Sequence, residues 1–404
     1  MEKDNKVVVS GMGIVSALGV ELDAFFEKLC SGTDATGPIE TYITDNFRRK
    51  NTAQIRFPLP VPDCWSNYNR ALQMALIAAG SALEDSLIKP VEYGDRMGLS
   101  IGTLLGGIPE VQKQYYISGA NDISDVEKTQ LQQFCYSAAA DAIAYEFGIN
   151  GIRNTIGVAC ASGTIAIGIA YKWIKYGRAD AVLCGGVDIF SLTSHMIMSN
   201  LKLISPDRIR PFDENRKGFL LGEGAGMLVL ESEKSANKRG AKIYCRVLGY
   251  GDTCDGGDMN HPDVNGAGLS KAMEKAIKEA NISKSEIKYI NAHGTATIKN
   301  DSAEIASIRK TFSGLTKDMY VSSIKGAIGH ANGAAGAIEA IASILALTHN
   351  KLPPTINFVS NDEISDLSIV PNKAISTELN AVMSNSVAFG GINSSIIFGR
   401  YEYE

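Results

Sequence analysis

Cys160 is the residue of this chain best placed for nucleophilic chemistry. It lies in the stretch from Gly157 to Gly163, after a short apolar run and before an apolar run of helical length. At a helix N-terminus, free N–H groups and the helix dipole favour a thiolate, and the same N–H groups can hold an oxyanion. We therefore expect Cys160 to be unusually nucleophilic. The other six of the seven cysteines lie in no such turn and are expected to be inert.

Two of the five histidines, His293 and His330, lie in glycine-rich turns that follow apolar runs. A neutral imidazole can donate a hydrogen bond to a carbonyl oxygen or move a proton near pH 7. We therefore expect both to be catalytic, and we expect His195, His261 and His349 to be structural. The sequence offers no further ligands at the spacing of a metal site, so no metal is expected.

Two charged residues flank His330 in the sequence. Lys325 precedes it by five residues, and Glu339 follows it by nine, within an apolar run. A glutamate among apolar residues needs a partner. We expect Lys325 and Glu339 to form a buried charge network that orients and tunes the histidines.

Alternating strands and helices must position these residues. A strand over 154–159, a helix over 162–176 and a strand over 181–184 predict a βαβ unit with Cys160 at its strand-to-helix turn. The chain opens with an expected strand over 6–10 that ends in a turn at Gly11–Gly13. Further strands are expected over 98–107, 225–231, 244–250, 289–292, 319–323, 381–387 and 395–398, and helices over 70–87, 268–280, 302–309 and 333–347.

With 404 residues, the chain exceeds what one hydrophobic core usually organises. We expect two α/β halves, an N-terminal half over residues 1–242 that carries Cys160 and a C-terminal half over residues 243–404 that carries both histidines. The two sets of elements suggest a diverged duplication, although no clean sequence repeat relates them.

Composition argues against several classes of function. The formal net charge is −5, and no basic run is long enough to follow a phosphate backbone, so nucleic acid is not an expected partner. No apolar stretch reaches the roughly 18 residues of a membrane span, and the N-terminus lacks a signal-peptide pattern. Seven cysteines without CxxC spacing suit reduced thiols. We expect a cytoplasmic protein without membrane association.

A nicotinamide-dependent oxidoreductase is a distant alternative. The opening from Val7 to Gly13 resembles a dinucleotide-binding fingerprint, but Ser16 stands at its third glycine position. The sequence therefore predicts no nucleotide cofactor.

Four motifs in order resemble those of the elongating β-ketoacyl-acyl carrier protein synthases, condensing enzymes of the thiolase superfamily. They are the Ala-Cys turn at Cys160, the segment Asn291–Thr295, the segment Lys325–His330 and the Phe-Gly-Gly turn at Phe389. The resemblance covers nearly the whole chain. It implies the duplicated thiolase-like α/β fold, a five-layer αβαβα sandwich, usually as a homodimer.

The resemblance also implies an activity. Cys160 would accept an acyl chain from a carrier thioester, and His293 and His330 would bind a malonyl thioester and assist its decarboxylation. The Phe389 N–H would be a second oxyanion donor, and its ring would gate the pocket. Lys325 and Glu339 match supporting charged positions. Thr295 and Thr297 match residues that contact pantetheine, so that the only prosthetic group is the carrier's phosphopantetheine and the enzyme needs no cofactor.

The chain departs from the family at several positions, which bear on substrate binding. Asn260 stands where a threonine usually contacts pantetheine, and Leu104 and Leu105 stand where a small residue and an aliphatic gate are common. Ala388 replaces a glycine beside Phe389. The basic helix that commonly meets the acidic acyl carrier protein is reduced, so a basic patch must come from elsewhere. The candidates are Lys202, Arg208 and Arg210, with Arg216 and Lys217.

Alternatives within the superfamily stay open to different degrees. A thiolase would need a second cysteine in a glycine-rich motif, and initiating synthases normally have asparagine where His330 stands. A non-catalytic partner subunit, comparable to a chain-length factor, typically loses the nucleophile. A heterodimer with a related subunit remains an alternative to the homodimer, and the pathway, fatty-acid or type II polyketide or polyene elongation, is left open.

Overall fold

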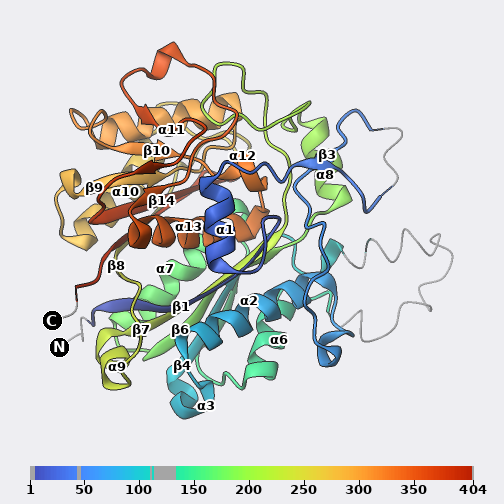
Figure 1. Cartoon of the computed structure of the whole chain (residues 1–404), viewed down its shortest axis with the longest axis vertical. Helices are drawn as coiled ribbons and strands as arrows, with labels where there is room; N and C mark the ends of the chain where they lie inside the picture. The colour runs from blue at the N-terminus through green and yellow to red at the C-terminus, as the bar shows by residue number, and fades with distance from the viewer. Residues whose placement is uncertain (1–4, 43–46, 110–111, 113–132, 403–404) are drawn as a thin grey trace.

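A single sheet of eleven strands forms the centre of the computed structural model, which describes residues 5–42, 47–109, 112 and 133–402 (Figure 1). The strand order is β12-β10-β9-β14-β15-β8-β1-β7-β6-β4-β5. The strands are β1 (Val7–Ser16), β4 (Met97–Gly102), β5 (Arg153–Ile156), β6 (Ala181–Asp188), β7 (Gly224–Ser232), β8 (Cys245–Cys254), β9 (Ile287–Asn291), β10 (Tyr320–Ser322), β12 (Ser368–Ile369), β14 (Ala381–Ala388) and β15 (Ile392–Arg400). Two-residue strands form the separate pairs β2 (Gly37–Pro38) with β3 (Asn51–Thr52) and β11 (Lys351–Leu352) with β13 (Ile375–Ser376).

The sheet consists of two strand sets with the same topology. In the set β5-β4-β6-β7-β1, the pairs β5–β4 and β4–β6 are parallel, and the pairs β6–β7 and β7–β1 are antiparallel. The set β10-β9-β14-β15-β8 repeats this sequence of parallel and antiparallel pairs. Three residue pairs between β1 and β8, from Val7–Val247 to Val9–Cys245, join the two sets at their edges. The expected duplication is thus visible in the topology.

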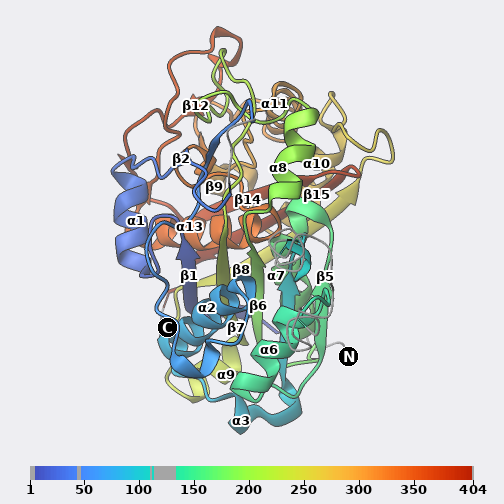
Figure 2. The same ribbon diagram turned by 90° about the vertical axis from the view of Figure 1, so that its right-hand side faces the viewer.

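Helices cover both strand sets and fill the space between them. The helices are α1 (Leu22–Cys30), α2 (Arg70–Ser86), α3 (Pro90–Tyr93), α6 (Ala138–Phe147), α7 (Ser162–Lys175), α8 (Leu192–Asn200), α9 (Glu233–Lys238), α10 (Ala267–Ala280), α11 (Ile298–Thr311), α12 (Lys325–Ile328) and α13 (Ala335–His349). One apolar cluster joins α2 and α6 to the first strand set, and another joins α10 and α11 to the second. Between the sets, α7 and α13 pack against strands of both (Figures 1 and 2). These layers confirm the thiolase-like αβαβα sandwich.

The prediction of a turn at Gly11–Gly13 is wrong, because β1 runs through both glycines to Ser16. A Cβ atom on Gly11 would lie 2.3 Å from the carbonyl oxygen of Ala82, and one on Gly13 would lie 2.0 Å from that of Ala78. The glycines therefore let the strand pack directly on the backbone of α2. Gly249 and Gly251 play the same part between β8 and α10.

Most other elements lie where expected, with shifted ends. The strand before Cys160 ends at Ile156, lies at the edge of the sheet and is partly exposed, so it is not the buried strand that its apolar residues suggested. Among the described residues, no single helix is long and apolar enough to cross a membrane. Only α2 together with the helical turns over Pro90–Arg96 meets that criterion, as a pair bent by 70°, and most of α2 is buried inside the protein.

Candidate active site

Cys160 lies in a 3₁₀ turn, Ala159–Ala161, that leads directly into α7, and its side chain is buried. The Ser162 hydroxyl fixes this turn. It accepts a hydrogen bond from the Val158 N–H (3.0 Å) and lies 2.6 Å from the carbonyl oxygen of Ala159. The thiol therefore projects from the N-terminus of the buried helix between the two strand sets.

The loops that carry Cys160, His293 and His330 each contain a non-glycine residue with left-handed backbone. These residues are Ala159 (φ 50°), Ala296 (φ 63°) and Asn332 (φ 51°). The left-handed conformation is costly for alanine, and such costs concentrate where packing fixes a functional geometry. We infer that the three loops are held in place by their surroundings.

A buried carboxylate holds the loop of His293, which follows β9. Glu304 on α11 accepts hydrogen bonds from the His293 N–H (2.9 Å) and the Gly294 N–H (2.8 Å). Asp301, one turn earlier on the same helix, accepts from the Ala296 N–H (3.1 Å). Neither acid was identified from the sequence. The signal for Glu304 is the same as that for Glu339, an acidic residue on the buried face of a helix.

Backbone and side-chain hydrogen bonds both fix His330. Its N–H donates to the carbonyl oxygen of Leu220 (2.8 Å), and its carbonyl accepts from the Gly222 N–H (2.9 Å). The Asn332 N–H donates to Nδ1 of the ring (3.2 Å). Because Nδ1 is an acceptor, the neutral ring carries its proton on Nε2.

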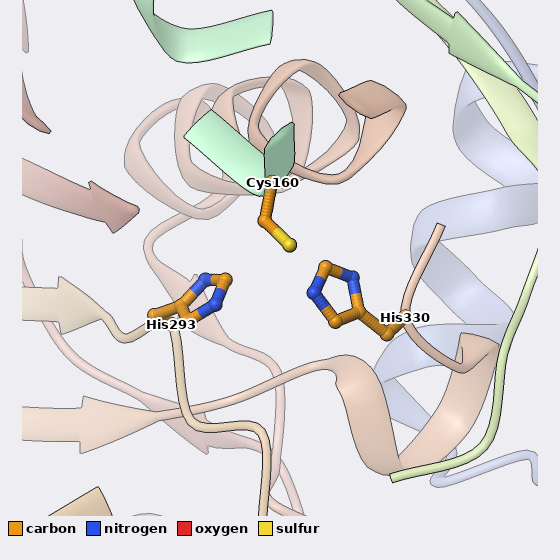
Figure 3. A group of neighbouring side chains, drawn as sticks. All are labelled: Cys160, His293 and His330. Carbon is orange, nitrogen blue, oxygen red and sulfur yellow. The ribbon is translucent and has the colours of Figure 1, made fainter. Parts of the chain in front are cut away.

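The three side chains converge, as Figure 3 shows. The Cys160 sulfur and a nitrogen from each of His293 and His330 all lie within 4.8 Å of one another. The two imidazole rings are 5.3 Å apart between centroids and nearly perpendicular, at 83°. The structure thus brings together residues from both halves of the chain.

Lys325 lies behind this group and contacts both His293 and Glu339. Its ammonium donates to the His293 carbonyl oxygen (2.6 Å) and lies 3.3 Å from Nδ1 of the same ring. It also forms a short ion pair with the Glu339 carboxylate. The buried network expected from the sequence is therefore present, and it turns the Nε2–H of His293 towards the site.

These hydrogen bonds bear on metal binding. One thiol and two imidazoles at this spacing could hold a cation such as zinc. A metal at Nε2, however, requires a free lone pair there, whereas Nδ1 of each ring faces an N–H donor. The Lys325 ammonium adds a nearby positive charge. The arrangement of the two imidazoles therefore suits hydrogen-bond donation from Nε2–H better than metal binding.

Burial is the largest influence on the pKa values of His293, His330 and Cys160. It lowers the pKa values of His293 and His330 well below the usual range, and the Lys325 charge lowers them further. Both rings are therefore neutral near pH 7. Burial also raises the pKa of Cys160 to about 12, although Lys325 opposes this effect. Loss of solvation therefore opposes the thiolate that the helix N-terminus favours.

Asp188, at the end of β6, is a further buried carboxylate that the sequence did not reveal. It accepts hydrogen bonds from the Thr103 hydroxyl (2.9 Å) and from the N–H groups of Leu104 (2.7 Å), Leu105 (3.0 Å) and Gly333 (2.6 Å). Burial raises the pKa of Asp188 to about 6 in spite of these donors. Asp188 therefore ties the loop after β4 to the loop after His330.

A cavity of about 470 Å³ opens above the three side chains. Of the residues predicted to bind substrate, Asn260, Thr295, Thr297 and Phe389 line it, but Leu105 does not, and its neighbour Leu104 does. The loop after β4 turns only one of the two leucines into the cavity. The N–H groups of both leucines donate to Asp188, and which side chain faces the cavity has no signal in the sequence.

The predicted basic patch divides into three groups. Lys202 and Lys217 are exposed and line the cavity, together with Lys299, which sequence reasoning missed. Arg208 and Arg210 lie outside the cavity lining, and Arg210 pairs with Asp207. Arg216 also lines the cavity, but its side chain is buried and donates to the Asp213 carbonyl and the Ser302 hydroxyl.

Comparison with known proteins gives a consistent result along the chain. The family described as "Beta-ketoacyl synthase, N-terminal domain" matches residues 4–236, and "Beta-ketoacyl synthase, C-terminal domain" matches residues 244–359. The 3-oxoacyl-[acyl-carrier-protein] synthase 2 of Staphylococcus aureus (strain COL) is 34% identical over 419 residues and covers 100% of both chains. The protein of the same name from Coxiella burnetii is 34% identical and covers 99% of both chains.

Solved structures with the same fold include two from ketosynthase complexes. The ishigamide ketosynthase/chain length factor aligns with a TM-score of 0.92 at 32% identity, over 99% of this chain and 100% of that chain. The second structure is a complex of a type II polyketide synthase acyl-carrier protein with its ketosynthase. One of its chains aligns with a TM-score of 0.91 at 29% identity, over 98% of this chain and 100% of that chain.

Proposed function

The chain belongs to the beta-ketoacyl synthase family, and from that premise we propose that it catalyses a decarboxylating Claisen condensation on carrier-bound substrates. The products are a 3-ketoacyl-acyl carrier protein and CO₂. The observation that carries the proposal is the convergence of one thiol and two neutral imidazoles, each presenting an Nε2–H, within 4.8 Å.

In the first half-reaction, Cys160 attacks the carbonyl carbon of an acyl thioester. The new C–S bond forms at Cys160, the bond to the carrier sulfur breaks, and the carrier thiol leaves with the proton. Since the pKa of the buried thiol is about 12, its proton must be transferred during the attack, and it ends on the departing carrier sulfur. Backbone N–H groups of Cys160 and Phe389 are the proposed oxyanion donors.

In the second half-reaction, the malonyl thioester loses its carboxylate as CO₂, and the bonding electrons form an enolate. The Nε2–H groups of His293 and His330 donate to the enolate oxygen, as two neutral donors in a buried site are suited to do. The enolate carbon attacks the acyl carbonyl, and the Cys160 sulfur leaves. The family resemblance and the geometry both support these roles for the histidines.

The cavity residues and the basic side chains support an acyl carrier protein as partner. Thr295, Thr297 and Asn260 are proposed to contact the pantetheine arm, since they line the cavity. Lys202, Lys217 and Lys299 line it as exposed cations, and they would attract the acidic carrier. Arg208 and Arg210, which the sequence also predicted to contact the carrier protein, lie outside the cavity lining.

We propose a catalytic subunit that acts as a dimer, since all three reactive side chains are present. The ketosynthases of two similar structures are solved with chain length factors, and mixing purified chains distinguishes such a pair from a homodimer. All seven cysteines are free, which supports a cytoplasmic location.

The intact mass of the protein after incubation with acyl-carrier thioesters tests the proposal. The wild type should gain the mass of the acyl group, Cys160→Ala should not, and Cys254→Ala, which removes an exposed thiol, should gain it normally. Addition of malonyl carrier should then discharge the acyl group as a 3-ketoacyl product. A wild type that is never acylated would contradict the proposal.

A further inference from the structure

Asn332 is a buried polar residue of the cavity wall whose side-chain amide is unpaired at Nδ2. The residue lines the cavity with only 3% of its surface exposed, and its Nδ2 has no hydrogen-bond partner among the residues that the structure describes. Thr295 and Asn300, which are also buried and line the cavity, each have a side-chain partner. A buried donor without a partner costs free energy, which a ligand that supplies an acceptor recovers.

The backbone at Asn332 does not by itself require an amide side chain. Its φ of 51° lies in the left-handed region, which glycine adopts at no steric cost. Its N–H donates to Nδ1 of His330, and every residue except proline has such an N–H. A glycine would therefore serve this loop without burying an unpaired donor. The presence of the amide points to a role in binding.

The loop of Asn332 lies beside the nucleophile and to one side of the histidine donors. Gly333, the next residue, donates its N–H to Asp188 (2.6 Å), and a Cβ atom on Gly163, in the first turn of α7, would lie 2.9 Å from the Gly333 carbonyl oxygen. The Asn332 N–H bonds Nδ1 of His330, whereas the malonyl thioester is assigned to Nε2 on the other side of the ring. The Asn332 amide is therefore better placed for the acyl group on Cys160 than for the malonyl carbonyl.

The chemistry of the acyl group decides whether the amide finds a partner. Much of the remaining cavity wall is apolar and includes Leu104, Met198, Phe219 and Val387, so an unsubstituted chain would leave the amide unpaired. The product of the proposed condensation is a 3-ketoacyl group, and its reduction gives a 3-hydroxyacyl group. Both carry an oxygen at C3, close to the thioester. Rotation of the amide presents either Nδ2–H or Oδ1, so that a carbonyl or a hydroxyl can be bound.

We propose that Asn332 is a specificity residue that favours acyl groups with an oxygen at C3, a carbonyl or a hydroxyl, over the fully reduced chain of the same length. The inference rests on the proposed condensing function and deepens it, since it states which acyl groups Cys160 accepts. Such groups come from an earlier condensation whose C3 oxygen has not been removed by dehydration and reduction. A substrate that leaves a buried polar group unpaired is discriminated against strongly.

The experiment measures the initial rate of Cys160 acylation by intact mass, with butyryl, 3-hydroxybutyryl and 3-oxobutyryl carrier thioesters at low concentration. We expect the wild type to favour the two oxygenated donors by about tenfold or more, and Asn332→Leu, which keeps the volume but loses the amide, to lower this ratio by about tenfold or more. Asn332→Gly should lower it similarly without backbone strain, which keeps the test decisive if the leucine variant folds poorly. Asn281→Leu is the control, because Asn281 has the same left-handed backbone (φ 53°) but is exposed and outside the cavity lining. It should keep the wild-type ratio.

The possible outcomes distinguish failure of this inference from failure of the proposed function. Equal rates for all three donors in the wild type, or a wild-type ratio in both Asn332 variants, would overturn the selection by Asn332 alone. A defect confined to the later reaction with malonyl carrier, equal for every acyl group, would assign the amide to the malonyl carboxylate and also overturn it. A wild type that no donor acylates would overturn the proposed function, and with it this inference.

Discussion

Lys325 and Glu339 form an ion pair whose side chains are only 1% and 2% exposed. Lys325 belongs to the short helix α12 and Glu339 to the long central helix α13, and the pair lies directly behind His293. A single ammonium group thereby connects the two helices to the loop of a catalytic residue.

We predict that Lys325→Met is strongly destabilising, because it leaves a carboxylate buried without its partner. Loss of one member of a buried pair costs about 3–5 kcal/mol, whereas replacement of both members by apolar residues is often neutral. The double variant Lys325→Met/Glu339→Leu should therefore recover much of the free energy of unfolding, measured with denaturant. It should not recover decarboxylation, since His293 would still lack the ammonium beside its Nδ1. Recovery of both properties would show that the pair has no role beyond stability.

His293→Ala and His330→Ala should impair decarboxylation of malonyl carrier much more than acylation of Cys160. Each removes one donor to the enolate oxygen, and loss of one such donor typically costs about 10²–10³ in rate. The two steps are separated by CO₂ release and by intact mass. His349→Ala, at the end of α13 and remote from the cavity lining, is the control. A histidine variant that decarboxylates at the wild-type rate would contradict its assigned role.

Activity and stability should respond to pH in opposite directions. Burial raises the pKa values of Glu339 and Glu304 to about 7, from an ordinary 4.5. Decarboxylation should rise with pH through about 7, because only the ionised Glu339 pairs with Lys325. The histidines, whose pKa values are lowered, remain neutral in this range and add no second step.

The free energy of unfolding should change with pH in the opposite direction. Between about 4.5 and 7 the folded protein keeps protons on these carboxyl groups that the unfolded chain has released, so their contribution to the free energy of unfolding is present at low pH and lost as pH rises through 7. Glu339→Gln should flatten the pH dependence of decarboxylation, whereas Glu363→Gln, an exposed acid, should not. A profile unchanged in Glu339→Gln would assign the ionisation to another group.

Gly13→Ala and Gly251→Ala should both destabilise the fold by about 1–3 kcal/mol or more, because each added methyl group meets helix backbone. The Cβ atoms would lie 2.0 Å and 2.2 Å from carbonyl oxygens of α2 and α10. Thermal or denaturant unfolding measures the effect. Gly257→Ala, where a Cβ would contact nothing within 4 Å, should be near neutral. Wild-type stability in Gly13→Ala would mean that α2 can move away from β1 at no cost.

Lys202→Glu should raise the KM for an acyl-carrier substrate several-fold, with most of the effect at low salt, since steering of an acidic partner is screened by ions. The kcat/KM for a small acyl-pantetheine thioester should stay close to the wild-type value. An equal loss with both substrates would place Lys202 in the binding of pantetheine instead of the carrier protein.

The sequence identified the three side chains that the fold brings together, because each of them lies in a short motif at the end of an apolar element. It also predicted the alternation of strands and helices. Gly11 and Gly13 were misread because glycine marks turns and also allows close packing of two elements, and a single sequence does not separate these uses. The repetition of the pair as Gly249 and Gly251 was the available signal.

The carboxylates that support the site were harder to predict. Asp188 binds N–H groups 83 to 145 residues away in the chain, so its role depends entirely on how the loops meet. The same is true of the choice between Leu104 and Leu105, which the rotation of one loop decides. The local helix effect at Cys160 is visible in the sequence, whereas the burial that opposes it is not.

The three residue pairs between β1 and β8 join the two strand sets into one continuous sheet. Because the nucleophile comes from one half and both imidazoles from the other, a hinge between the halves would pull the reacting groups apart with every opening. The continuous sheet removes that freedom. Access to the cavity can then come from local movement of the segments around it, such as the turn at Phe389, without separating the thiol from the imidazoles.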